Sequence, residues 1–224
     1  MLIALVPPAS AATLTMQGWY QGQGNKVTVT NPSYQGLAGG FRGELSGLSD
    51  QRFNLRDLEM YCVDLLQTIN PAAGTSYSVK MDGEPGTTTF VIKPIEQVFD
   101  AGRVERLSQL ISYVGATPAL VSNAAQSTSL QLAIWNILYD NDSSLSAYAG
   151  AQFSDSSSYR HLAGDLLVQS AGFRVDRQLY VMTSTSRQDQ LFWLDVQQVP
   201  EPAGLALAVA ALGGMAVARR RVRR

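Results

Sequence analysis

The residue with the most distinctive chemistry is Cys62, the single cysteine of the 224-residue chain. It lies in Tyr61-Cys62-Val63-Asp64, within a segment from Leu58 to Leu66 that predicts a buried strand. On such a strand, Cys62 and Asp64 share one face and Tyr61 points to the other. A cysteine thiolate is a nucleophile. The two ends of the chain, described below, predict that the protein is exported. An unpaired thiol outside the cytoplasm is expected to be buried, bonded to a partner chain or used chemically.

Gln131 is the second residue of interest, because its carboxamide is predicted to lie beside apolar side chains. It falls early in a predicted helix from about 128 to 139, and Trp135 is its neighbour on the same face four positions later. An adjacent apolar stripe is formed by Leu130, Ile134, Ile137 and Leu138. Burial of a carboxamide is costly unless it is hydrogen-bonded. We therefore expect Gln131 to be partly buried.

The two segments together resemble the paired motifs of bacterial thioester domains, an aromatic-Cys-x-Asp strand motif followed by a Gln-x-Ala-x-Trp helix motif. Here these are Tyr61-Cys62-Val63-Asp64 and Gln131-Leu132-Ala133-Ile134-Trp135, in the family's order. The resemblance implies that the Cys62 thiol displaces ammonia from the Gln131 carboxamide and forms an internal thioester. Tyr61, Asp64 and Trp135 would surround that bond.

A thioester is an electrophile that an amine, such as a lysine on another surface, could attack at the acyl carbon of Gln131. The attack would leave an amide and free the Cys62 thiol. Because this event occurs once per molecule, the resemblance implies a covalent binder rather than an enzyme, and we expect no cofactor. The thioester domains in question lie mostly on Gram-positive adhesins with a different anchoring tail. The target therefore stays open between matrix polysaccharide amines, a neighbouring envelope protein and a host surface.

The same residues also allow plainer interpretations. Cys62 could be a small buried core residue, and Gln131 a solvated helix residue. A cysteine protease needs a histidine near the thiol, but the only one, His161, lies in a polar helix and favours a surface position. Asp140, Asp142 and Ser144 lack the glycine and glutamate of a calcium loop and favour a helix C-terminal turn. We predict no catalytic residues and no metal site.

The N-terminus predicts the remnant of a signal peptide over residues 1–11. Leu2 to Val6 are typical of the end of an apolar signal-peptide core, and Ala9-Ser10-Ala11 gives the small-x-small pattern of a cleavage site after Ala11. The positively charged region that should precede the core is missing, so we expect the true start to lie upstream. A frayed apolar N-terminus is the alternative.

The C-terminus has three parts in a specific order. Pro200-Glu201-Pro202 is followed by an apolar run over 203–218 and by five arginines among the last six residues. As a helix, this run would be roughly 24 Å long, short of a hydrocarbon core of about 30 Å. The arginines would lie on the cytoplasmic side of the inner membrane. We predict a minimal transmembrane helix or tail anchor, with a buried core helix as the alternative.

The same three parts resemble the PEP-CTERM sorting signal of Gram-negative bacteria over Val199 to Arg224. The resemblance implies recognition by an exosortase and cleavage near Pro200-Glu201-Pro202. It also implies an association with exopolysaccharide and biofilm systems. The predicted domains are therefore 1–11, 12–198 and 199–224, and the protein would be held only transiently in the inner membrane before reaching the cell surface or extracellular matrix.

Hydrophobic periodicity predicts an α+β fold for 12–198, with strands flanking a helical middle, plus the C-terminal transmembrane helix. Strands are expected at 26–30, 58–66, 178–183 and 190–196, and a hairpin at 77–81 and 87–92. Glycine-rich residues 36–47 predict turns. Helices are expected at 95–114 after Pro94, at 128–139 capped by Ser127 or Thr128, and at 157–169 ended by Gly172.

Composition sets limits on function. Apolar residues make up 46% and charged residues 16% of the chain, which is typical of a secreted β-rich or α+β protein. The net charge is −1 even with the terminal arginines, so a nucleic-acid surface is not expected. The leading hypothesis is covalent, adhesive attachment to amine-bearing partners. The second is an exported structural biofilm or matrix protein without a thioester, and an enzyme is a distant third.

Overall fold

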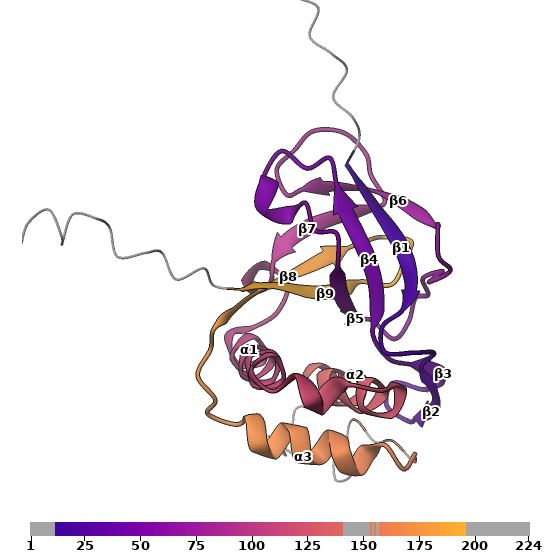
Figure 1. Cartoon of the computed structure of the whole chain (residues 1–224), viewed down its shortest axis with the longest axis vertical. Helices are drawn as coiled ribbons and strands as arrows, with labels where there is room; N and C mark the ends of the chain where they lie inside the picture. The colour runs from indigo at the N-terminus through magenta and orange to yellow at the C-terminus, as the bar shows by residue number, and fades with distance from the viewer. Residues whose placement is uncertain (1–11, 141–152, 154, 156, 196–224) are drawn as a thin grey trace, which may run out of the picture. The chain divides into compact units, whose positions relative to one another are not determined.

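The computed structural model describes residues 12–140, 153, 155 and 157–195. The chain divides into two compact units, Met1–Leu194 and Asp195–Arg224, and of the second unit the described part is Asp195. Within the described residues, seven strands close into a barrel, two more form a separate sheet, and three α-helices accompany them (Figure 1).

The barrel joins strands from both ends of the described chain. In their order around the barrel they are β1 (Thr13–Trp19), β4 (Phe41–Ser46), β5 (Leu58–Cys62), β9 (Gln190–Asp195), β8 (Arg177–Thr183), β7 (Phe90–Pro94) and β6 (Ser76–Met81). The antiparallel pairing of β5 with β9 places the segment around Cys62 beside one of the last described strands. This pairing decides which side chains surround the sulfur.

The other elements lie between and beside the barrel strands. They are β2 (Asn25–Val29) and β3 (Tyr34–Ala38), the short 3₁₀ helices η1 (Gln51–Phe53), η2 (Ile95–Gln97) and η3 (Pro118–Val121), and the helices α1 (Ala101–Ala116), α2 (Ala124–Tyr139) and α3 (Arg160–Ser170). In Figure 1 the three helices lie together below the barrel, and β2 and β3 lie near one end of α2.

Helix α2 is the central helix of the group. Every residue from Ser127 to Leu138 is buried, as expected for a helix covered on all sides. It begins where the side chain of Asn123 accepts a hydrogen bond from the backbone N–H of Gln126, at 3.0 Å. Helix α1 is instead amphipathic, with Leu107, Leu110, Ile111 and Val114 on its buried side. The burial of α2 brings its polar side chains into contact with the barrel.

The predicted α+β arrangement of strands around a helical middle is wrong, because the structure is a seven-stranded β-barrel with three helices. The glycine-rich residues 36–47, predicted to form turns, instead form the end of β3 and all of β4. Close packing limits the side chain that this segment can carry: a Cβ on Gly40, just before β4, would lie 2.7 Å from Cζ of the buried Tyr61 ring. Strand β1 was also not predicted.

The predicted hairpin at 77–81 and 87–92 is wrong as well. Strands β6 and β7 occupy these positions but pair in parallel, with Val79 opposite Phe90. The chain between them folds back beside the second half of β6, where the N–H of Thr89 donates to Ser78 Oγ at 2.9 Å. Lys80 holds this return by donating to the backbone oxygens of Glu84 and Gly86, at 2.8 and 2.7 Å.

The helices and the last two strands lie close to their predicted positions, but the helix starts differ. Asp100 and Asn123, rather than Pro94 and Ser127 or Thr128, cap the first two helices. In the described residues, no helix is long and apolar enough to cross a bilayer. The predicted signal-peptide remnant at 1–11 and the predicted tail at 199–224, with Pro200, Glu201 and Pro202, lie outside the described residues.

Candidate functional site around Cys62

Cys62 is the last residue of β5, and its direct partner across the strand pair is Gln190, the first residue of β9. The neighbouring pair is joined by a hydrogen bond from the N–H of Val63 to the carbonyl of Asp189, at 3.0 Å. Hydrogen-bonded and non-hydrogen-bonded pairs alternate along antiparallel strands. Cys62 and Gln190 therefore form a non-hydrogen-bonded pair, the kind that brings opposing side chains closest together.

The sulfur of Cys62 is in contact with two carboxamides from the same segment of chain. Sγ lies 2.8 Å from Oε1 of Gln188, and it lies 3.8 Å from Oε1 and 3.6 Å from Nε2 of Gln190. All three residues are buried, with exposed fractions of 4% for Cys62, 6% for Gln188 and 0% for Gln190. A nucleophilic atom and two potential acyl donors thus share a site from which water is excluded.

Gln131 also lies at Cys62, but it contacts the backbone. Its Oε1 accepts the N–H of Cys62 at 2.9 Å, and its Nε2 donates to the Cys62 carbonyl at 2.7 Å. Strand β4 is paired with β5 only as far as Met60. The Gln131 carboxamide therefore replaces the missing strand on that edge and satisfies two buried backbone groups. The structure brings Cys62 and Gln131 together as predicted, but with the Gln131 carboxamide on the backbone rather than on the sulfur.

Other polar side chains of α2 extend this support along the barrel edge. The N–H of Gly40 donates to Ser127 Oγ at 2.8 Å, and Thr128 Oγ1 donates to the carbonyl of Ala38 at 2.7 Å. At the far end of the helix, Tyr139 Oη accepts the N–H of Leu65 at 3.1 Å. Helix α2 thus fixes the chain on both sides of Cys62.

Trp135 and Asp64, both predicted to surround the site, do so in different ways. Trp135 is 1% exposed and packs edge-on against Tyr34, with ring centroids 5.3 Å apart. The Cys62 thiol lies close enough to raise the pKa of Tyr34, second to burial. The Asp64 carbonyl accepts Gln188 Nε2 at 2.6 Å, and its carboxylate accepts the N–H of Leu66 at 2.8 Å. Asp64 therefore orients Gln188 through its backbone.

Burial keeps the thiol protonated. It raises the pKa of Cys62 to about 12, opposed by the hydrogen bond from Gln190 and reinforced by the negative charge of Asp64. Burial also raises the pKa of Asp189 to about 6. The groups that touch the sulfur itself are neutral carboxamides.

Tyr61 belongs to a separate polar cluster on the opposite face of β5. Its hydroxyl lies 3.1 Å from Ser127 Oγ, and its ring stacks on Trp193 with centroids 6.3 Å apart. It also hydrogen-bonds the Glu59 carboxyl, whose pKa burial raises to about 7. Tyr61 is therefore part of the structural support beside Cys62 and does not face the sulfur.

The sequence-based alternatives find little support in the described residues. His161 is exposed on α3, whereas Cys62 is buried at the end of β5. Asp140 follows α2 and donates its N–H to the Asn136 carbonyl at 2.9 Å, as a helix-terminal residue does, while Asp142 and Ser144 lie outside the described residues. Over the described ranges, no group of three or more histidine, cysteine or acidic side chains could hold a metal ion.

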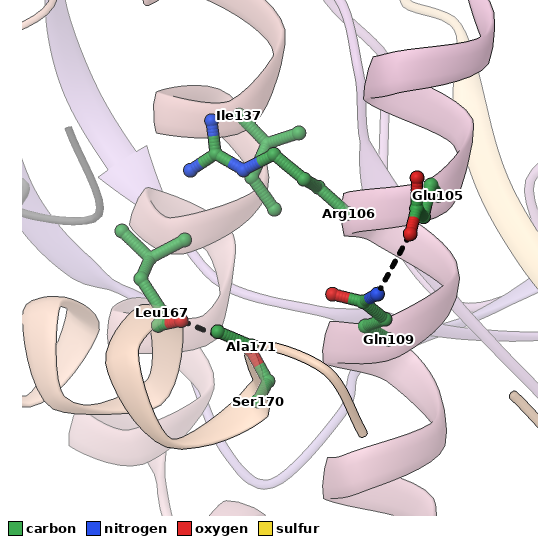
Figure 2. A pocket seen from close by; sticks show the side chains of 7 residues that line it. All are labelled: Glu105, Arg106, Gln109, Ile137, Leu167, Ser170 and Ala171. Carbon is green, nitrogen blue, oxygen red and sulfur yellow. Dashed lines mark hydrogen bonds between the residues drawn. The ribbon is translucent and has the colours of Figure 1, made fainter. Parts of the chain in front are cut away.

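A hollow of about 260 Å³ lies between the three helices (Figure 2). It is lined by Glu105, Arg106, Gln109, Ile137, Leu167, Ser170 and Ala171. Gln109 donates to the Glu105 carboxylate at 3.2 Å across its rim. The lining contains no thiol or other strong nucleophile, so the arrangement at Cys62 is the better candidate for chemistry.

Gln188 and Gln190 were not predicted as site residues, although the sequence contained a usable signal. Gln188, Gln190 and Phe192 are spaced two apart at the start of a predicted strand, so they face one side together. Two carboxamides on the buried face of a strand are unusual and require partners. What the sequence could not supply was the pairing of β9 with β5.

No family model, curated protein or solved structure matches the chain. The chemistry of the site therefore has to be argued from its own geometry.

Proposed function

We propose that the protein attaches covalently to amine-bearing partners through an internal thioester between Cys62 and Gln190. The observation that carries this proposal is the position of the sulfur between the oxygen and the nitrogen of the Gln190 carboxamide, at 3.8 and 3.6 Å. Because both atoms are bonded to Cδ, the sulfur lies close to the carbon at which an acyl transfer would occur. Fixed proximity of this kind is the main requirement for an intramolecular acyl transfer.

The geometry favours Gln190 over the other two glutamines at the site. Gln131 uses both ends of its carboxamide on the Cys62 backbone. Gln188 contacts the sulfur through its oxygen alone, and its nitrogen donates to the Asp64 carbonyl. The resemblance to thioester domains thus leads to a revised pairing, in which Gln131 positions Cys62 and Gln190 supplies the acyl group.

The reaction balances without an added reagent. The Cys62 sulfur bonds to Cδ of Gln190, the bond from Cδ to Nε2 breaks, and the thiol hydrogen leaves with the nitrogen as ammonia. In a second step, a primary amine attacks the same carbon, an amide forms, and the sulfur regains a proton as a thiol. Each molecule reacts once, so the protein consumes its own bond and is not a turnover enzyme.

The burial of the site fits the storage of such a bond and still leaves a route for the amine. A thioester survives only while it is shielded from water, and Gln190 is 0% exposed. Two segments next to the site in the sequence are nevertheless exposed to solvent. Leu66, four residues after Cys62, is 80% exposed, and Arg187 beside Gln188 is also exposed. A partner that displaces either segment would reach the acyl carbon.

Export and sorting complete the proposal. Delivery to the cell envelope and processing by an exosortase remain predictions from Ala9-Ser10-Ala11 and Pro200-Glu201-Pro202. The amine-bearing partner would then be met at the cell surface or in the extracellular matrix.

The test is the intact mass of the purified full chain beside the variants Cys62→Ala and Gln190→Leu. We expect the parent to lack one ammonia and to gain one methylamine on treatment, while both variants keep their full mass. A parent of full mass with a titratable thiol would overturn the proposal and favour an exported structural matrix protein instead.

A further inference from the structure

We infer that Gln188 is a positioning residue. Its carboxamide oxygen accepts the hydrogen bond from the Cys62 thiol, and this bond orients the sulfur toward Gln190. This inference rests on the proposed thioester and adds a residue that neither motif of the resemblance contains. It assigns different tasks to two glutamines that lie two positions apart in the sequence.

The contact between Gln188 and the sulfur is direct and short. Sγ donates to Oε1 of Gln188 across 2.8 Å, the closest contact recorded for the sulfur. A thiol has one hydrogen to donate. When that hydrogen points at Gln188, the lone pairs of sulfur are free to face the Gln190 carboxamide.

Both the side chain and the backbone carbonyl of Gln188 take part in hydrogen bonds. Its Nε2 donates to the carbonyl of Asp64 at 2.6 Å, which fixes its oxygen toward the sulfur. Its own carbonyl accepts Nε2 of Gln190 at 2.9 Å. The two carboxamides are therefore oriented relative to each other as well as to Cys62, and one side-chain change should disturb both.

The same contacts explain why Gln188 would not compete as the acyl donor. A sulfur that approaches an amide oxygen end-on along a hydrogen bond is not placed over the amide carbon. The sulfur contacts Gln190 through both the oxygen and the nitrogen of its carboxamide, whereas it contacts Gln188 through the oxygen alone.

Several titratable groups face this site, and any pH experiment has to account for them. Asp64 and Asp189 flank it; Asp64 raises and Lys93 lowers the pKa of Asp189, and Cys62 contributes to raising the pKa of Tyr34 and Tyr139. An introduced carboxyl at position 188 would therefore meet mainly negative neighbours. It would be neutral only toward lower pH.

The first experiment reads the thiol directly and does not depend on thioester formation. Because Cys62 is the single cysteine, the full chain has one S–H stretching band in the infrared. The measurement uses the Gln190→Leu variant, in which no thioester can form and the thiol stays free. When Gln188→Leu is added to it, we expect the band to shift to higher frequency, because the S–H group loses its hydrogen-bond acceptor. The matched control, Gln169→Leu on the exposed side of α3, should leave it unchanged. An unshifted band in Gln188→Leu would overturn the inference.

The second experiment measures ammonia loss in chains that retain Gln190. We expect Gln188→Leu to slow ammonia loss about tenfold or more, because the sulfur loses its orientation. Gln188→Glu should recover the reaction only where its carboxyl is protonated, since that form again donates to Asp64 and accepts from sulfur. Unchanged ammonia loss in Gln188→Leu would contradict the inference. A parent that keeps its ammonia while the S–H band still responds to Gln188→Leu would count against the thioester alone.

Discussion

The two faces of strand β5 carry polar clusters of different chemistry. On one face, Cys62 meets Gln188 and Gln190, and every group in contact with the sulfur is a neutral carboxamide. On the other face, the Tyr61 hydroxyl lies 3.1 Å from Ser127 Oγ and hydrogen-bonds the carboxyl of Glu59, which is half-buried. The first cluster has the atoms of an acyl transfer, whereas the second has a group that gains or loses a proton near neutral pH.

Because their titratable groups differ, the two clusters should respond differently to pH. Burial raises the pKa of Cys62 to about 12, so the thiol stays protonated across the physiological range. Burial raises the pKa of Glu59 to about 7, so its charge changes within that range. Changes of pH near neutrality should therefore alter the free energy of unfolding more than the state of the sulfur.

The largest effect on stability is expected from Gln131→Leu, which removes the support on the Cys62 edge. The variant leaves the N–H and the carbonyl of Cys62 buried without partners, at a cost of about 2–5 kcal/mol. Urea unfolding measures this loss. The control Gln97→Leu, at an exposed position of η2, should change the unfolding free energy by less than about 0.5 kcal/mol. Equal effects of the two variants would refute the proposed role of Gln131.

Gly40→Ala tests the close packing beneath Tyr61. A Cβ at this position would lie 2.7 Å from Cζ of the Tyr61 ring, which is fully buried and cannot move aside freely. We expect a loss of about 1–3 kcal/mol in thermal or urea unfolding. Gly102→Ala in the first turn of α1, where the nearest atom is 3.4 Å away, is the control and should not destabilise the protein. No loss in Gly40→Ala would mean that the ring tolerates displacement.

Glu59→Gln sharpens the contrast between the two faces. A carboxyl with a raised pKa keeps its proton in the folded state when the unfolded chain has lost it. Stability should therefore fall as pH rises from about 4.5 to about 7. The amide removes this dependence, and we expect the variant to exceed the parent by about 1–2 kcal/mol above neutral pH. Parallel stability curves for the two proteins between these pH values would contradict the assignment.

Asp189→Asn should have the smallest effect. Burial raises the pKa of Asp189 to about 6 from an ordinary value of 3.8, so the carboxyl also lowers stability as pH rises through that window. The asparagine oxygen can still accept the N–H of Ser184, which lies 2.7 Å from the carboxylate. The expected gain at neutral pH is below about 1 kcal/mol because the group is half-exposed. A large loss would show that the charge itself holds the 184–189 turn.

Local patterns in the sequence predicted the helices and several strands, but not the barrel. The period of apolar residues in α1 and α2 depends on neighbours three and four positions apart, and these were visible in the sequence. Strand β4 was hidden because Gly43 and its neighbours signal turns, whereas the lack of space for a side chain at Gly40 comes from Tyr61 on a distant segment. The parallel pairing of β6 and β7 depends on how residues 82–89 fold back, which no local pattern indicates.

The residues of the candidate site were likewise predictable only in part. Cys62, Gln131 and Trp135 could be singled out because each is unusual in its local setting. The structure brings Cys62 and Gln131 into contact and buries Trp135 one turn further along the same helix. The assignment of Gln131 as the bonded residue assumed that proximity of two residues means proximity of their reactive atoms. The cross-strand register instead brings Gln190 to the sulfur, and register is a property of two distant segments rather than of either one.

The most direct test of the central claim is to locate the methylamine label. The full chain would be treated with methylamine, digested and sequenced by tandem mass spectrometry, with Gln131, Gln188 and Gln190 read separately. We predict N-methylglutamine at position 190 alone, together with a newly free thiol at Cys62. A label at position 131 or 188 would contradict the proposed pairing, and a chain without label would contradict the thioester.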